Sequence, residues 1–103
     1  MNRIEAQRRP RPAAVLDPAA RKRLDRLRRR DPEAARRISA LIRHLDTDPR
    51  PRGAAPLASG GGLYRIATGK LRVVYTPTCP AVVMHLGYRR DVYNGFGAGC
   101  REA

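Results

Sequence analysis

Cationic side chains dominate the second half of this sequence, and almost no carboxylates accompany them. After Asp48 the only acidic residues are Asp91 and Glu102. The cationic residues of the same half are Arg50, Arg52, Arg65, Lys70, Arg72, Arg89, Arg90 and Arg101. Because these cations have few acidic partners within the chain, a phosphate backbone is the ligand we expect to neutralise them.

The overall composition points in the same direction. The chain has 22 Lys and Arg residues against 9 Asp and Glu residues, which gives a net charge of +13 and an isoelectric point near 11.4. Solubility does not require such an excess, so we expect a polyanionic partner, most commonly nucleic acid. A GC-rich genome explains the preference for arginine over lysine but does not explain the net charge.

Length and composition exclude several classes of protein. A chain of 103 residues has room for one domain with a modest core. No window approaches the ~18 apolar residues of a membrane span, and the N-terminal segment has no apolar signal-peptide region. We therefore expect a cytoplasmic protein without membrane contact. Cys79 and Cys100 have neither CxxC nor histidine spacing, so we expect no disulfide, no metal site and no cofactor.

Two Asp-Pro pairs predict the starts of two helices. Asp17 and Asp31 are N-cap acceptors, and each is followed by a proline suited to the first helical position. Apolar residues then follow at helical spacing, namely Ala20, Leu24 and Leu27 after the first pair and Ile38, Leu41, Ile42 and Leu45 after the second. A third pair, Asp48-Pro49, ends the second helix. The pattern predicts an antiparallel helical hairpin that turns around Arg30.

Short β-type runs flank this hairpin. The predicted strands are Ala13–Leu16, Leu63–Ala67, Leu71–Thr76 and Ala81–Gly87. Residues 68–70 form a tight turn with a glycine, and the Pro- and Gly-rich segment 49–62 is predicted to be a connecting loop. The expected fold class is α+β, with an N-terminal strand, a helical hairpin and an antiparallel sheet of three or four strands.

Period-2 alternation assigns the faces of this sheet. Leu71, Val73 and Tyr75 are predicted to face the helices. The opposite, open face is predicted to carry Arg65, Arg72, Val83 and His85, and we place the candidate site there. Residues 13–93 are expected to form the domain, after a flexible basic arm over 1–12 and before a Gly-rich tail over 94–103. A start codon set too far upstream would also explain the arm.

Three sequence blocks in order resemble a known family. They are Gly62-Leu63-Tyr64-Arg65-Ile66, Leu71-Arg72-Val73-Val74-Tyr75 and Leu86-Gly87-Tyr88-Arg89-Arg90-Asp91-Val92-Tyr93. Together with the preceding helical hairpin, they resemble the RelE/ParE toxin superfamily over residues 13–93. The resemblance implies a RelE-like fold and the toxin of a type II toxin–antitoxin system.

The two branches of that superfamily differ in activity. The RelE branch implies a ribosome-dependent mRNA endoribonuclease, in which an mRNA 2′-hydroxyl attacks the adjacent phosphate without a metal. The ParE branch implies an inhibitor of DNA gyrase. A third hypothesis is a toxin fold with weak or lost activity. For all three, the resemblance implies a cognate acidic antitoxin that mediates any contact with operator DNA, and the RelE branch adds the ribosome and mRNA as partners.

The RelE resemblance carries roles to individual residues. Arg72 matches the arginine that stabilises the transition-state phosphate, and Arg89 matches a second phosphate clamp near the leaving group. Arg65 matches a phosphate contact. Tyr93 matches a terminal tyrosine that stacks on a base or takes part in proton transfer. The neighbouring cations Lys70 and Arg90 are added as RNA-binding candidates.

The chain also departs from the family pattern. Ala67 stands where a second basic residue is usual, and Tyr88 stands where the terminal motif often has histidine. Arginine is a poor general base, so Tyr93 and His85 remain as proton-transfer candidates. Three of these residues also have an ordinary structural explanation. Arg72 is then an exposed strand cation, and Tyr93 caps the core. For His85 we favour the structural explanation, a half-exposed strand histidine. Arg89 and Arg90 are adjacent, so they cannot both point at one site.

Overall fold

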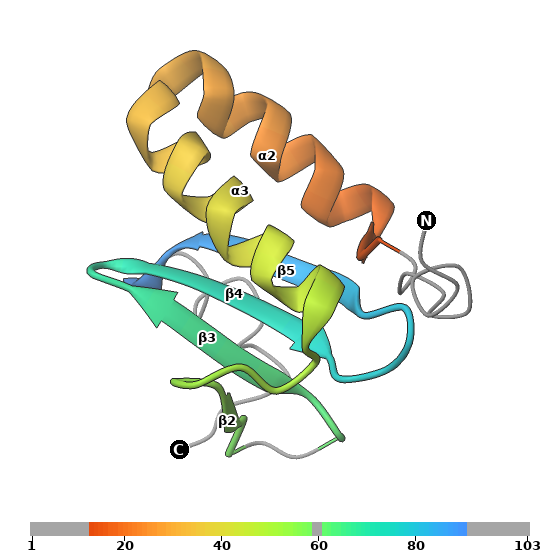
Figure 1. Ribbon diagram of the computed structural model, residues 1–103. Coiled ribbons are helices and arrows are strands. Elements are labelled where there is room, and N and C mark those ends of the chain that lie inside the picture. Colours follow the sequence, from red (N-terminus) through yellow and green to blue (C-terminus); the bar gives the residue numbers. More distant parts are fainter. Residues whose placement is uncertain (1–12, 59–60, 91–103) are drawn as a thin grey trace, which may run out of the picture.

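The computed structural model describes residues 13–58 and 61–90 of the chain. Its elements in order are β1 (Val15–Leu16), α2 (Pro18–Arg30), α3 (Pro32–Thr47), β2 (Ala55–Pro56), β3 (Tyr64–Thr68), β4 (Leu71–Thr76) and β5 (Val82–Tyr88). The fold is α+β, with the two helices packed on one face of a single sheet (Figure 1). The predicted arm over 1–12 and tail over 94–103 lie outside the described residues.

The predicted helical hairpin is confirmed, including both of its N-caps. The Asp17 carboxylate accepts a hydrogen bond from the Ala19 amide at 3.1 Å, and the Asp31 carboxylate accepts one from the Ala34 amide at 3.2 Å. Asp31 also ends α2, because its own amide donates to the Leu27 carbonyl. One residue therefore closes the first helix and opens the second, which makes the turn between them as short as possible.

The sheet is larger than predicted, and it is mixed. Its strand order is β1-β5-β4-β3-β2, and β1 runs parallel to β5 while the other pairs are antiparallel. The prediction of an antiparallel sheet of three or four strands is therefore met only in part, because β2, β3, β4 and β5 pair antiparallel whereas β1 joins the sheet in parallel. The connection from β1 to β5 runs through both helices and the three other strands, and such a partner choice is not visible in the local pattern of either strand.

The fifth strand comes from the segment predicted to be a loop. Ala55 and Pro56 form β2, which pairs with Arg65 and Tyr64 of β3. The Leu57 amide continues this contact by donating to the Leu63 carbonyl at 2.8 Å. A two-residue edge strand that contains proline carries too little β-type pattern to be recognised in sequence.

The β3–β4 hairpin matches its prediction closely. A two-residue connection of Gly69 and Lys70 joins the strands, and Gly69 has a φ of 59°. Positive φ at this position favours glycine, which is why the tight turn forms here. The register places Thr68 opposite Leu71 and Ala67 opposite Arg72.

A β-bulge in β5 changes the faces predicted for that strand. Val74 pairs with His85 whereas Tyr75 pairs with Val83, so Met84 is the extra residue. The bulge lets Val83 and Leu86 point to the same side, and both are buried in the core beneath the helices. The prediction that Val83 shares the opposite face with His85 is therefore wrong, since simple alternation ignores the extra residue.

The core lies between the helices and the sheet, with α3 over β3 and β4 and α2 over β5 (Figure 1). Ile38 and Leu45 of α3 are 0% and 1% exposed, and they belong to the same buried cluster as Val73 and Tyr75 of β4. The inward direction predicted for Leu71, Val73 and Tyr75 is confirmed. Within residues 13–58 and 61–90, no helix combines the length and the apolar character needed to cross a bilayer.

Tyr75 connects the end of the helical hairpin to the sheet through a hydrogen bond. Its hydroxyl donates to the Pro49 carbonyl at 2.7 Å, just after α3 ends. Its ring lies 6.2 Å from that of Tyr64, and the Arg50 guanidinium lies 5.2 Å above the Tyr64 ring. Burial is the main cause that raises the pKa of Tyr75 to about 12, and the nearby Tyr64 and Asp48 add to it.

Replacement of Tyr75 tests this anchor. We expect Tyr75→Phe to lower the free energy of unfolding by about 1 kcal/mol at pH 7, because the buried hydrogen bond to Pro49 is lost. The raised pKa of Tyr75 also predicts that the wild-type contribution is intact below pH 10.0 and declines as the pH rises toward about 12. Urea unfolding should therefore be measured at several pH values from 7 to 11. We expect the free energy of unfolding to fall less steeply with rising pH in the variant than in the wild type. An identical decline in both proteins would contradict the role of Tyr75.

Candidate functional site: a cationic cluster at the end of the β3–β4 hairpin

Four cations gather where the β3–β4 hairpin meets the end of β5. We call Lys70, Arg72, Arg89 and Arg90 the hairpin cluster. Lys70 is the second residue of the turn, and the Arg89 amide donates to its carbonyl at 2.7 Å, so the backbone itself holds the two residues opposite each other. Lys70, Arg89 and Arg90 are exposed, and with Tyr88 they line a surface depression of about 520 Å³.

The hairpin turn holds the Arg72 side chain in place. Arg72 Nη1 donates to the carbonyls of Gly69 and Leu71, at 2.7 Å and 3.0 Å. A guanidinium has five N–H donors, so the groups on Nη2 and Nε remain available to a ligand. Arg72 is half-buried, and its two carbonyl contacts orient a planar bidentate donor before any phosphate arrives.

Arg65 lies on the same sheet face as Arg72, one step farther along the strands. Arg65 is opposite Val74, and Arg72 is two residues from Val74 on β4. Such diagonal neighbours have Cα atoms about 7–8 Å apart, within reach of two long side chains. Ala67 is directly opposite Arg72, so the missing basic residue would have stood beside this arginine.

His85 is placed differently from its prediction. It pairs with Val74 on the face opposite the helices, as expected, but it is only 7% exposed, and Val74 is 0% exposed. The prediction that His85 is half-exposed on an open face is therefore wrong, because the face is buried at His85 and Val74. A buried imidazole has little access to a substrate, and this burial speaks against His85 as the acid or base of the hairpin cluster.

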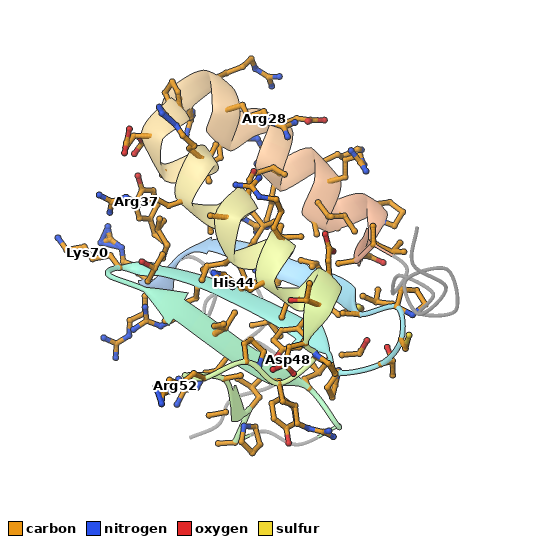
Figure 2. All side chains as sticks on the ribbon, viewed as in Figure 1. Arg28, Arg37, His44, Asp48, Arg52 and Lys70 are labelled. Atoms are coloured by element: carbon orange, nitrogen blue, oxygen red, sulfur yellow. The ribbon has the colours of Figure 1, made fainter. Side chains whose placement is uncertain are left out.

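Cations of the hairpin cluster have no acidic partners in the described part of the chain. The ion pairs found there lie within the helices, between Arg28 and Asp25 and between Glu33 and both Arg36 and Arg37. Lys70 projects from the hairpin end of the sheet, on the same side of the molecule as Arg37 (Figure 2). The cluster therefore presents positive charge that residues 13–58 and 61–90 do not neutralise, which suits an anionic ligand.

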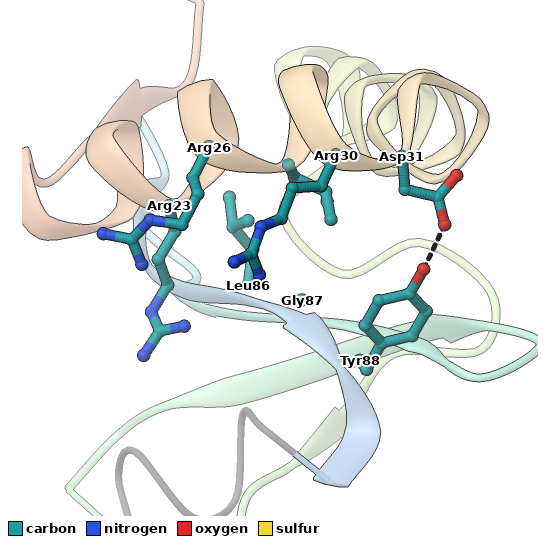
Figure 3. A pocket seen from close by; sticks show the side chains of 8 residues that line it. Arg23, Arg26, Arg30, Asp31, Leu86, Gly87 and Tyr88 are labelled. Carbon is teal, nitrogen blue, oxygen red and sulfur yellow. Dashed lines mark hydrogen bonds between the residues drawn. The ribbon is translucent and has the colours of Figure 1, made fainter.

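A contact that the sequence did not reveal positions the end of β5. The Tyr88 hydroxyl donates to the Asp31 carboxylate, which joins the turn between α2 and α3 to the strand that leads into Arg89 (Figure 3). This hydrogen bond is the main cause that lowers the pKa of Asp31, and the hydrogen bond from the Ala34 amide adds to it. Asp31 was recognisable in the sequence only as a helix cap, and Tyr88 only as a departure from histidine.

The predicted site residues are thus brought together in part. Lys70, Arg72, Arg89 and Arg90 share the hairpin end of the sheet, Arg65 adjoins them, and His85 is buried nearby. Tyr93 lies outside the described residues. The arrangement can bind and orient phosphate groups, and it assigns no proton-transfer residue.

Replacement of Tyr88 tests the contact with Asp31. We expect Tyr88→Phe to raise the pKa of Asp31 toward its ordinary value, because the carboxylate loses its strongest hydrogen-bond donor. In the wild type, the stabilisation by Asp31 is present above the unfolded-state pKa of about 3.9 and is lost as the pH falls through the lower folded-state pKa. NMR titration of the Asp31 carboxyl checks the shift, with Tyr64→Phe as a matched loss of a phenol elsewhere. The same Asp31 titration in Tyr88→Phe and the wild type would contradict the contact.

Comparison with known proteins does not identify a family. None of the protein-family models matches the chain, and no curated protein shows significant similarity to it. A functional assignment therefore depends on the residues of this chain, on their geometry, and on the three sequence blocks that resemble the RelE/ParE superfamily.

Proposed function

We propose that the chain is a RelE-like toxin of a type II toxin–antitoxin system, an endoribonuclease that cuts mRNA on the ribosome. The observation that carries this proposal is the hairpin cluster, in which a pre-oriented Arg72 lies at the same end of the sheet as Lys70, Arg89 and Arg90 without acidic partners among the described residues. Such a surface suits a phosphate backbone better than an uncharged ligand.

The placement of the three resembling blocks supports the proposal. The block around Arg65 falls on β3, the block around Arg72 on β4, and the third block begins on β5 and continues into Arg89. These three strands are neighbours in the sheet, so the residues to which the resemblance gives related roles lie on adjoining strands. A chance match of short motifs would not require this proximity.

The chemistry that the cluster suits is an internal transesterification of RNA. The 2′-oxygen forms a bond to the adjacent phosphorus, and the bond from phosphorus to the 5′-oxygen breaks. The 2′-proton leaves to a base and the 5′-oxygen gains a proton, which yields a 2′,3′-cyclic phosphate and a 5′-hydroxyl. Negative charge grows on the phosphoryl oxygens, and Arg72 would stabilise it with its free N–H groups while Arg89 binds nearer the leaving oxygen.

Proton transfer requires a residue other than arginine. An arginine side chain is a poor general base, and His85 is buried. In this proposal Tyr93 remains the candidate, supported by the family resemblance alone. Ala67 also removes one cation beside Arg72. Both features favour a slow enzyme over an efficient one.

The proposed partners follow from the same resemblance and from charge. A small acidic antitoxin would cover the cationic surface and keep the toxin inactive, and contact with operator DNA would come only through that antitoxin. The ribosome and its mRNA are the proposed targets, with the cytoplasm as the site of action and no part for a membrane, a metal or a cofactor.

Induced expression with mRNA end-mapping tests the function. We expect the wild type to arrest growth and to produce new mRNA 5′-ends within codons. Arg72→Ala should reduce cleavage by roughly 10²–10³-fold, because one transition-state donor is lost. Arg28→Ala is the matched control, since Arg28 is an exposed arginine of α2 whose side chain pairs with Asp25.

The other outcomes separate the competing hypotheses. Growth arrest with normal mRNA ends, an induced DNA-damage response and full toxicity of Arg72→Ala would replace the nuclease with a gyrase inhibitor. Wild-type expression without any growth defect, in the absence of antitoxin, would show a toxin fold that has lost its activity. Equal loss of cleavage in Arg72→Ala and Arg28→Ala would remove Arg72 from the active site.

A further inference from the structure

A second group of unpaired arginines lines a groove on the helix side of the molecule. Arg23, Arg26 and Arg30 of α2 line it from above, and Leu86, Gly87 and Tyr88 of β5 line it from below. Figure 3 shows the three arginine side chains leaving α2 on the side that faces β5. The groove has a volume of about 310 Å³, near the lower end of the range for ligand pockets.

The spacing of the three arginines gives them a common direction. They lie at positions i, i+3 and i+7, which fall on one face of a helix. With a rise of about 1.5 Å per residue, they form a row about 10 Å long. Such a row of guanidinium groups matches an extended anion better than a single small ion.

These arginines have no acidic partners in the described part of the chain. The neighbouring Asp25 is engaged by Arg28, at 3.1 Å. Asp31, the one carboxylate among the described residues that line the groove, accepts hydrogen bonds from Tyr88 and Ala34. Three cations close together repel one another, and the Asp31 carboxylate offsets only part of that cost. A bound polyanion would offset more of it.

The floor of the groove is formed by the last part of β5. Gly87 has a φ of 137°, a conformation that favours glycine, and it places no side chain in the groove. β1 pairs only with Val82 and Val83 of β5, so it does not extend alongside this part of the strand. Leu86 and Gly87 are buried, so a ligand in the groove would meet the arginine side chains rather than the backbone of β5.

We propose that this groove is a binding site for consecutive phosphate groups, carried either by a single-stranded RNA backbone or by a free polyphosphate chain. The three arginines bind the phosphates along α2, and Asp31 sets the limit of the site, because its carboxylate repels phosphate at that end. The site lies apart from the hairpin cluster, on the other side of Tyr88, and it does not depend on any nuclease activity.

Binding of a non-cleavable RNA tests the proposal on the full chain. The probe is a fluorescein-labelled 2′-O-methyluridine dodecamer, which lacks the attacking hydroxyl, so binding is measured whether or not the protein cleaves RNA. We expect the triple variant R23A/R26A/R30A to bind about tenfold or more weakly at 0.1 M salt. The slope of log affinity against log salt should become shallower by about 2, since each lost phosphate contact removes about 0.7.

The matched control removes the same charge from another face of the same helix. The variant R21A/R28A/R29A also loses three arginines of α2, none of which lines the groove. We expect its affinity to change less than threefold. Circular dichroism should show the same helix content in both variants, because alanine is at least as good a helix former as arginine. Equal loss of binding in the two triple variants would overturn the groove.

Competition experiments identify the chemistry and the source of the phosphates. If tripolyphosphate displaces the probe from the wild type but does not displace the residual probe bound to R23A/R26A/R30A, the groove is supported as a site for free phosphate chains. If tripolyphosphate does not displace the probe from the wild type, and R23A/R26A/R30A binds the probe more weakly, the groove is supported as a site for an RNA backbone. Displacement by a hexaglutamate peptide as effectively as by tripolyphosphate would overturn phosphate recognition, because any anion would then serve.

Discussion

Several features of the molecule depend on Asp31. Its backbone amide ends α2, one of its oxygens caps α3, and the other accepts the Tyr88 hydroxyl at the end of β5. The two helices and the last strand are thereby joined through one residue, and the hydrogen bonds to its carboxylate lower its pKa. A neutral carboxyl would accept these bonds more weakly. Arg89 and Arg90 follow Tyr88 directly. Their position therefore depends on the contact of Tyr88 with Asp31, which lies 57 residues earlier in the chain.

Local chemistry in the sequence predicts the helical hairpin and the β3–β4 hairpin well. Asp-Pro at both helix starts and glycine in the tight turn are signals whose physical cause lies within a few residues. The parallel pairing of β1 with β5 and the short β2 strand have no such local cause, because they are set by the packing of distant segments. The bulge at Met84 likewise arises from the register of β5 against β4 and reverses the face assigned to Val83.

The candidate site shows the same division between local and distant causes. Arg65, Arg72 and Lys70 could be placed from alternation and from the turn, and the register brings them together as expected. The exposure of His85 could not be predicted, since alternation says which face a residue is on and not whether that face is covered. The contact between Tyr88 and Asp31 was also out of reach, because neither residue carries a sequence pattern that points to the other.

Tyr88 lies at the boundary between the two cationic surfaces. It lines the groove beneath Arg23, Arg26 and Arg30, and it also lines the depression formed by Lys70, Arg89 and Arg90. Since the charges on both sides repel one another within a small domain, their proximity is a cost to folding. The Asp31 carboxylate is placed at this boundary, where its negative charge offsets part of that repulsion and where it holds the Tyr88 ring between the two surfaces. One carboxylate can thus keep the cationic surfaces close without neutralising either, which leaves both available to an anionic partner.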